Sequence, residues 1–155
     1  MTSADERESL IRDFGVLLGA ASRVERIAAR AFERECGISH AMFEVLLRLD
    51  PGGDGSSMSE LACDLILTSG GMTRLIDRMV KAGLVRRYPS TTDRRIQLAD
   101  LTPRGQDMLA QAKRVHAETL KRFFAGPLSD GDREALVAAL RQVDDRARKE
   151  LGGLG

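Results

Sequence analysis

One stretch of the sequence, from Thr68 to Arg95, constrains the fold more than any other. Its first half is apolar at helical spacing, and its second half is strand-like and then basic and turn-rich. Apolar side chains three, four and seven positions apart lie on one face of an α-helix. Here these residues are Met72, Leu75, Ile76, Met79 and Val80. The pattern predicts a helix from Thr68 to Lys81, capped at its start by Thr68 or Ser69 and ended by Gly83.

This stretch is also strongly basic. Seven Lys or Arg residues against two Asp give it a net charge of +5, whereas the whole chain of 155 residues carries only +1. A basic patch on a nearly neutral chain is typical of nucleic-acid binding. A basic helix face can also be ordinary solvated surface, so the charge alone does not decide the function.

The composition is that of a single helical domain. Apolar residues make up 43% of the chain, charged residues 30% and aromatic residues only 4%, which favours packed helices over sheets. No apolar run approaches the roughly 20 residues that span a bilayer, and the first residues are acidic and polar rather than secretory. We therefore expect a cytoplasmic protein without a membrane partner.

The elements before this stretch are also predicted to be helices. Helical periodicity runs from Glu8 to about Glu35, which is longer than a small core can cover, so part of this helix is expected to pack on a partner chain. A second helix follows Ser39, and Ser57 with Glu60 forms a capping box that opens a short third helix. This short helix and the basic one after it form a helix-turn-helix candidate.

The elements after the basic helix begin with a β-hairpin. Strand-like residues at 85–88 and 96–101 flank a basic, turn-rich segment, and one further pair of β residues is expected near Ser57. Thr102-Pro103 then opens another helix, and Ser129 opens the last. The predicted fold class is mainly α with a small β-hairpin.

Four motifs carry a resemblance to a known family. They are SELA at 59–62, GGMTRLIDRMVKAGLVRR at 70–87, DRR at 93–95 and LTPRG at 101–105. In this order and spacing they resemble the MarR family of bacterial transcription regulators. The resemblance implies one domain over 1–155, with a winged helix-turn-helix at 39–103 and dimerisation helices at 8–36 and 104–150. It also implies DNA binding, under the control of a small ligand or of oxidation.

The predicted DNA-binding residues lie on the basic helix, on the strand after it and at the hairpin tip. An α-helix fits the major groove, where arginine can contact guanine with two hydrogen bonds, and a bare helix start lets backbone N–H groups approach a phosphate. A basic hairpin tip can enter the minor groove. The residues are Thr68, Ser69, Gly70, Thr73, Arg74, Asp77, Arg78, Arg86, Arg94 and Arg95.

Two details of this assignment depend on neighbours. By resemblance, Asp93 holds an adjacent wing arginine in place without touching DNA, and the choice between Arg94 and Arg95 for the minor groove stays open. Because a strand alternates its faces, at most one of Arg86 and Arg87 points toward DNA, and the other supports the fold.

The leading hypothesis is a homodimeric repressor that a small-molecule effector releases from a palindromic operator. The resemblance places an effector pocket among Phe14, Leu17, Met42, Phe43 and Leu46. One alternative is a winged-helix module that binds protein, since a fold does not fix a function. A second alternative is a thiol-based redox regulator that acts through Cys36.

The other reactive side chains give weaker signals. Cys63 lies beside apolar residues and is expected to be buried as a small hydrophobe. His40 and His116 are isolated in the sequence and are expected to be solvated or core residues. No pattern indicates a metal site, a cofactor or a catalytic constellation, so we do not expect an enzyme.

Overall fold

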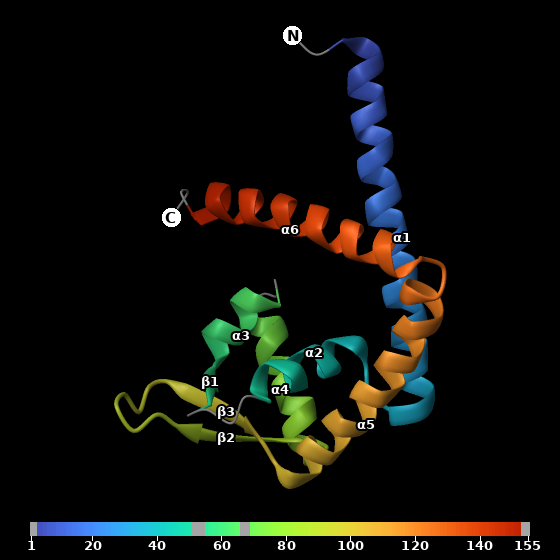
Figure 1. Cartoon of the computed structure of the whole chain (residues 1–155). Coiled ribbons are helices and arrows are strands. Elements are labelled where there is room, and N and C mark those ends of the chain that lie inside the picture. The colour runs from blue at the N-terminus through green and yellow to red at the C-terminus, as the bar shows by residue number, and fades with distance from the viewer. Residues whose placement is uncertain (1–2, 51–54, 66–68, 153–155) are drawn as a thin grey trace. The chain divides into compact units, whose positions relative to one another are not determined.

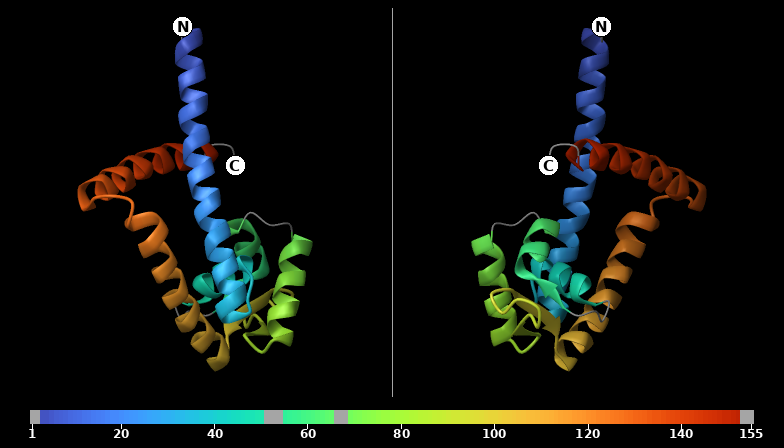
Figure 2. Two further views of the ribbon diagram at one scale, coloured as in Figure 1. Left: turned by 90° about the vertical axis from the view of Figure 1, so that its right-hand side faces the viewer. Right: turned by 90° about the vertical axis from the view of Figure 1, so that its left-hand side faces the viewer.

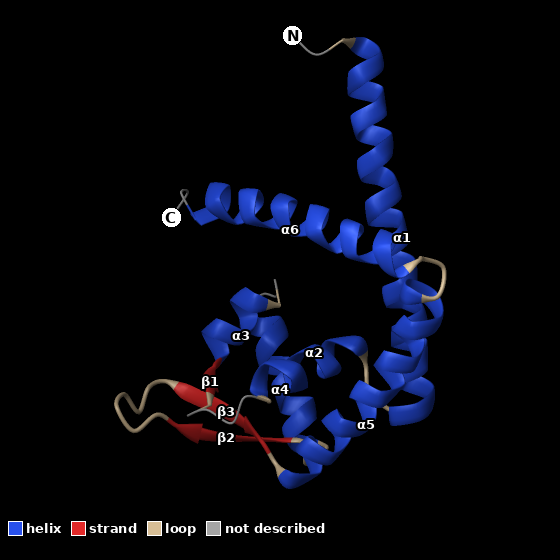
Figure 3. Ribbon diagram, in the orientation of Figure 1, coloured by secondary structure: helices blue, strands red, loops and turns tan. Residues whose placement is uncertain are grey.

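The computed structural model describes residues 3–50, 55–65 and 69–152 (Figures 1 and 3). The chain forms two compact units, Met1–Ala117 and Glu118–Gly155. None of the helices within the described ranges is long and apolar enough to cross a membrane.

The first helix, α1, spans Ala4–Cys36. It begins four residues before the predicted start at Glu8 because Ser3 and Glu6 form a capping box, in which the Ser3 side chain accepts a hydrogen bond of 3.1 Å from the Glu6 backbone N–H. It ends at Gly37, whose φ of 67° is the left-handed conformation that favours glycine. Its N-terminal half projects away from α2 (His40–Leu49), α3 (Met58–Asp64) and α4 (Ser69–Lys81) in all three views (Figures 1 and 2). The buried residues of α1 all lie near its C-terminal end.

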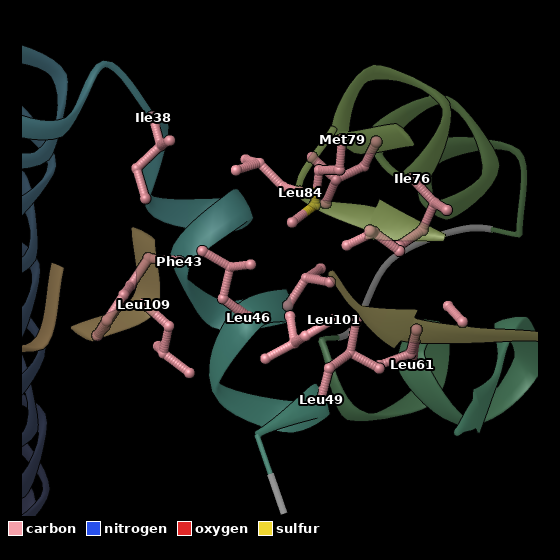
Figure 4. Close-up of a cluster of buried hydrophobic side chains, with 14 of the residues drawn as sticks. Ile38, Phe43, Leu46, Leu49, Leu61, Ile76, Met79, Leu84, Leu101 and Leu109 are labelled. Carbon is pink, nitrogen blue, oxygen red and sulfur yellow. The ribbon is translucent and has the colours of Figure 1, made fainter. Parts of the chain in front are cut away.

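The core of the first unit lies among three short helices, a sheet and the facing sides of α1 and α5 (Figure 4). The helices are α2 (His40–Leu49), α3 (Met58–Asp64) and α4 (Ser69–Lys81). Caps fix where two of them begin: the Ser39 side chain accepts from the Met42 N–H, and Ser57 and Glu60 form the predicted capping box. Among the largest fully buried side chains are Phe32, Phe43, Leu46, Leu61, Met72, Ile76, Met79 and Leu109.

The sheet has three antiparallel strands in the order β1-β3-β2. They are β1 (Ser56–Ser57), β2 (Val85–Pro89) and β3 (Gln97–Leu101). β2 and β3 form the predicted hairpin, with Val85 opposite Leu101, and β1 supplies the expected β pair near Ser57 by lying opposite Ala99. The fold is therefore mainly helical with a three-stranded wing.

A hydrogen-bonded junction joins the wing to α5 (Pro103–Leu120). Gly83 takes the predicted left-handed conformation with a φ of 73°. Thr102 caps α5 by accepting from the Gly105 N–H at 3.0 Å, and its hydroxyl donates to the Gly83 carbonyl at 2.6 Å. A Cβ built on Gly105 would lie 2.0 Å from the Leu84 carbonyl oxygen, so only glycine allows this close approach.

The second unit consists of the end of α5, a π-helical turn (Lys121–Ala125) and α6 (Asp130–Gly152). The Ser129 side chain accepts from the Asp132 N–H at 3.1 Å, which confirms the predicted start of the last helix. No residue of α6 is buried, and Leu136, Val143 and Leu151 are exposed. Val137 and Leu140 are half-buried, so the apolar stripe of α6 is only partly covered.

Candidate nucleic-acid interface

Helix α4 has a buried underside and a polar outer side. Met72, Ile76 and Met79 are fully buried, whereas the predicted DNA-binding residues Gly70, Thr73, Arg74, Asp77 and Arg78 are exposed. Helix α4 therefore packs on the core with one side only, and its opposite side can contact a partner.

Val80 and the first residues of this helix need separate description. Val80, assigned to the apolar face, is 40% exposed because it lies at the border of that face. Thr68 lies outside the described residues and the Ser69 side chain is likewise not described, although Ser69 begins α4. The predicted cap and phosphate contacts of these two residues stay predictions.

The paired arginines of β2 point to opposite faces, as the alternation of a strand predicts. The Arg86 side chain is 66% exposed, and its Nη2 lies 2.8 Å from an Asp100 carboxylate oxygen, which raises the pKa of Arg86. The Arg87 side chain is only 27% exposed and contacts α4: its Nη1 lies 2.9 Å from Asp77 Oδ1, and its Nη2 donates to the Thr73 carbonyl at 3.1 Å. Arg86 is therefore the outward member of the pair.

At the wing tip, Asp93 holds Arg95. One carboxylate oxygen of Asp93 accepts from the Arg95 backbone N–H at 3.0 Å and from its Nε at 3.2 Å. The hydrogen bond from this backbone N–H, and then the one from the side chain, lowers the pKa of Asp93. The Arg95 side chain nevertheless stays 92% exposed, and Arg94 is exposed beside it. The neighbouring arginine that Asp93 restrains is thus Arg95.

The comparisons with known proteins agree with this geometry. The MarR family model matches residues 38–97, which hold α2, α3, α4 and most of the wing. The solved structure of AbsC, a MarR family transcriptional regulator from Streptomyces coelicolor, superposes with a TM-score of 0.79 at 24% identity and covers 96% of this chain and 98% of AbsC. The protein belongs to the MarR family.

Two transcriptional regulators also match over most of their length. The transcriptional regulator PecS of Dickeya dadantii is 28% identical over 145 residues, which cover 90% of this chain and 87% of PecS. The transcriptional repressor CouR, solved bound to a 23-mer DNA duplex, is 28% identical with a TM-score of 0.74 and covers 83% of this chain and 89% of CouR. This MarR-family protein is accordingly a DNA-binding transcriptional regulator rather than an enzyme.

The five residues predicted to line an effector pocket separate into two groups in this MarR-family chain. Phe43 and Leu46 are fully buried in the core, and Met42 packs against it. Phe14 is 58% exposed on the projecting part of α1, and Leu17, one turn further along, is half-buried. At 1.5 Å per residue, about 21 Å of helix axis separates Phe14 from Ala28, where α1 begins to contact the core. Within one chain, the structure brings the first three together and leaves the other two apart.

Two histidines that are isolated in the sequence meet in an aromatic cluster. His116 lies 5.4 Å from Phe32 and 5.0 Å from Phe43, between ring centroids, and His40 lies 5.9 Å from Phe32. Burial, followed by the charge of His40, lowers the pKa of His116, whereas Glu44 opposes this shift. The Nδ1 atom of His116 is buried without a hydrogen-bond partner. Sequence reasoning missed this cluster because its histidines are far apart along the chain.

The two cysteines differ in their exposure. Cys63 is exposed, so the prediction that it is buried is wrong. Successive helical residues turn by about 100°, which places Cys63 about 200° from the buried Leu61 on a different face of α3. Cys36 is half-buried, and burial and then the charge of Glu35 raise its pKa. A raised pKa lowers the thiolate fraction, which disfavours the redox alternative.

Metal donors do not gather in the described part of the chain. Residues 3–50, 55–65 and 69–152 contain no group of three or more His, Cys, Asp or Glu side chains that could hold an ion.

Proposed function

We propose that the protein is a homodimeric repressor that reads a palindromic operator and is released from it by a small-molecule effector. The observation that carries the proposal is the polar outer side of α4, where Arg74 and Arg78 are exposed above a fully buried apolar underside. The repressor CouR, solved with bound DNA, supports the same direction of regulation. The exposed side of α4 offers arginine, threonine and aspartate, which argues against an apolar surface for binding protein.

In this proposal, α4 enters the major groove. Arg74 or Arg78 forms the two-pronged contact to guanine O6 and N7. The start of α4 faces a phosphate, because its backbone N–H groups and helix dipole favour an anion. At Gly70 nothing lies within 4 Å of a built Cβ, so a phosphate has room to approach. Arg86 reaches a second phosphate from β2.

The wing enters the minor groove through Arg95. The backbone N–H and the guanidinium of Arg95 both donate to Asp93, while the Arg95 side chain stays 92% exposed. Such preorganisation reduces the side-chain entropy that is lost on binding DNA. Arg94 then lies at the edge of the groove, near a phosphate.

A second copy of the chain covers the exposed apolar residues of the terminal helices. On α1, the exposed fractions are 60% for Leu10, 73% for Ile11 and 58% for Phe14. On α6, they are 59% for Val143 and 70% for Leu151. Contiguous exposed apolar residues of this size typically mark an interface, and a two-fold dimer places its half-sites about 34 Å apart on DNA.

In this arrangement, residues 8–36 and 104–150 form the dimerisation layer of one 1–155 domain, and residues 39–103 form the DNA-binding lobe. An effector between these layers favours a spacing of the two α4 helices that no longer matches successive turns of the major groove. This regulator acts in the cytoplasm, where its DNA lies.

The test is a titration of fluorescently labelled DNA from upstream of the gene, read by anisotropy at several salt concentrations. In Arg74→Ala with Arg78→Ala, affinity for that DNA should fall by about 1–3 kcal/mol for each lost bidentate contact. Each lost phosphate contact should make the slope of log K against log salt shallower by about 0.9. Arg141→Ala with Arg146→Ala removes the same charge from α6 and should change neither quantity comparably. Unaltered affinity and slope in the α4 variant would rule out the proposed reading helix.

A further inference from the structure

We propose that Arg87 is a positioning residue that fixes the rotation of α4 against the wing, and that Asp77 belongs to this contact rather than to base reading. The inference rests on the proposed role of α4 in the major groove. It changes the role assigned to Asp77 from its exposed helical position.

Arg87 joins two elements with one side chain. From β2, its Nη2 donates to the Thr73 carbonyl at 3.1 Å and its Nη1 lies 2.9 Å from Asp77 Oδ1. These acceptors are one helical turn apart, so the guanidinium spans a full turn of α4. Its Nε atom is buried with no hydrogen-bond partner and the side chain is only 27% exposed, so Arg87 lies against α4 rather than extending into solvent. A planar, rigid guanidinium directs its N–H groups at two acceptors in a fixed fork, whereas the ammonium of lysine is a compact charge without this geometry.

The contact lies on one flank of α4. At about 100° per residue, Asp77 lies about 40° around the helix from Thr73, while Arg74 and Arg78 lie at about 100° and about 140°. Arg87 therefore contacts the flank of α4 that carries Thr73 and Asp77. The flank with Arg74 and Arg78 stays open. The buried underside sets how deep α4 sits, and the Arg87 contact sets which way its outer residues point.

Charge and position predict opposite effects for a change at Asp77. Asp77 is 57% exposed, and a carboxylate on a surface that faces DNA repels phosphates. If its charge alone mattered, Asp77→Asn would tighten DNA binding. If Asp77 anchors α4 through Arg87, Asp77→Asn weakens binding to the preferred sequence, although it removes a negative charge.

The experiment uses the full-length protein and a duplex selected by the wild-type protein from a random library, with a scrambled duplex of the same length for non-specific binding. Four proteins form a cycle: wild type, D77N, R87Q and the double variant, which has the net charge of the wild type. We expect each single variant to bind the selected duplex roughly tenfold more weakly, with little change on the scrambled duplex. The double variant should be no weaker than R87Q, because both changes break one contact.

R87K separates positioning from phosphate binding. It keeps the charge but lacks the fork geometry that matches the two acceptors, so it should be as weak as R87Q and leave the salt slope unchanged. Arg86→Gln is the matched control on the other face of β2, and it should weaken both duplexes and make the slope shallower. If a thermal melt shows that R87Q does not fold, the affinity of D77N for the selected duplex is sufficient to test the inference, since Asp77 lies at the surface.

Three results would overturn the inference: tighter binding by D77N, additive losses in the double variant, or wild-type affinity in R87K with a shallower slope in R87Q. Failure of the proposed function looks different. In that case Arg74→Ala with Arg78→Ala binds the selected duplex as well as the wild type, whatever the cycle shows.

Discussion

Acidification should weaken the fold through His116. Burial among Phe32 and Phe43 lowers the pKa of this imidazole. Its buried Nδ1 has no hydrogen-bond partner that would stabilise the protonated form. In the unfolded chain, histidine takes up its proton near a pH of about 6.5. The unfolded state therefore binds the proton first as the pH falls, and stability falls with it. Above about pH 6.5 this loss is absent, and it grows below that value until native His116 is also protonated.

The uptake of one proton by His116 sets the upper limit of this loss of stability. A difference of one bound proton changes the free energy of unfolding by about 1.4 kcal/mol per pH unit. His116 is partly exposed, so solvent screens its charge and the true slope is smaller. Two groups of α2 act on it in opposite senses: the charge of His40 lowers its pKa and that of Glu44 raises it.

The assay is urea unfolding of the wild type and His116→Phe at about pH 7.5 and about pH 5.5, at one fixed protein concentration because a dimer's stability depends on it. Phenylalanine keeps an aromatic ring in the cluster and removes the titrating group. We expect the wild type to lose more stability than the variant between these pH values. Equal losses in both proteins, or a larger loss in the variant, would refute the reasoning.

Two further predictions concern packing and the wing. Gly105→Ala should lower the midpoint of thermal unfolding, because its Cβ would clash with the Leu84 carbonyl at a cost of about 1–3 kcal/mol. Gly131→Ala, where nothing lies within 4 Å of the new Cβ, should not lower it, and equal effects at both sites would contradict the clash. Asp93→Asn should weaken DNA binding in an anisotropy titration without lowering thermal stability, because the ion pair with Arg95 is exposed. A matching loss of stability would mean instead that the pair supports the fold.

Local signals in the sequence predicted most of the elements. The caps at Ser39, Ser57 and Thr102 and the left-handed Gly83 involve partners only a few residues away. Such contacts form wherever the chain turns into a helix, so a short motif is sufficient to identify them. Apolar periodicity predicts the start of α1 four residues too late, because the polar Ser3 that caps the helix lies outside that periodicity.

Tertiary contacts were less predictable. His116 meets residues of α1 and α2 only because α5 packs on both helices, and one α5 side chain, Gln111, donates to the Glu35 carbonyl at 2.8 Å. No spacing rule connects positions that far apart. The exposure of Cys63 was predictable in principle, because helical geometry turns it away from Leu61, but neighbouring apolar letters in the sequence suggested burial.

The structure also changes the meaning of the charge on the stretch from Thr68 to Arg95. Its net +5 counts Arg87 as a basic residue, yet Arg87 is held against Asp77. Asp93 reduces the net charge too, but Arg95 stays 92% exposed beside it. The six other basic residues of the stretch, which include the ion-paired but exposed Arg86 and Arg95, then remain for phosphates or bases. If all of them touch DNA, they contribute about −11 to the salt slope of a dimer. A local charge count therefore sets an upper bound on DNA contacts, and ion pairs across the fold decide how many are left.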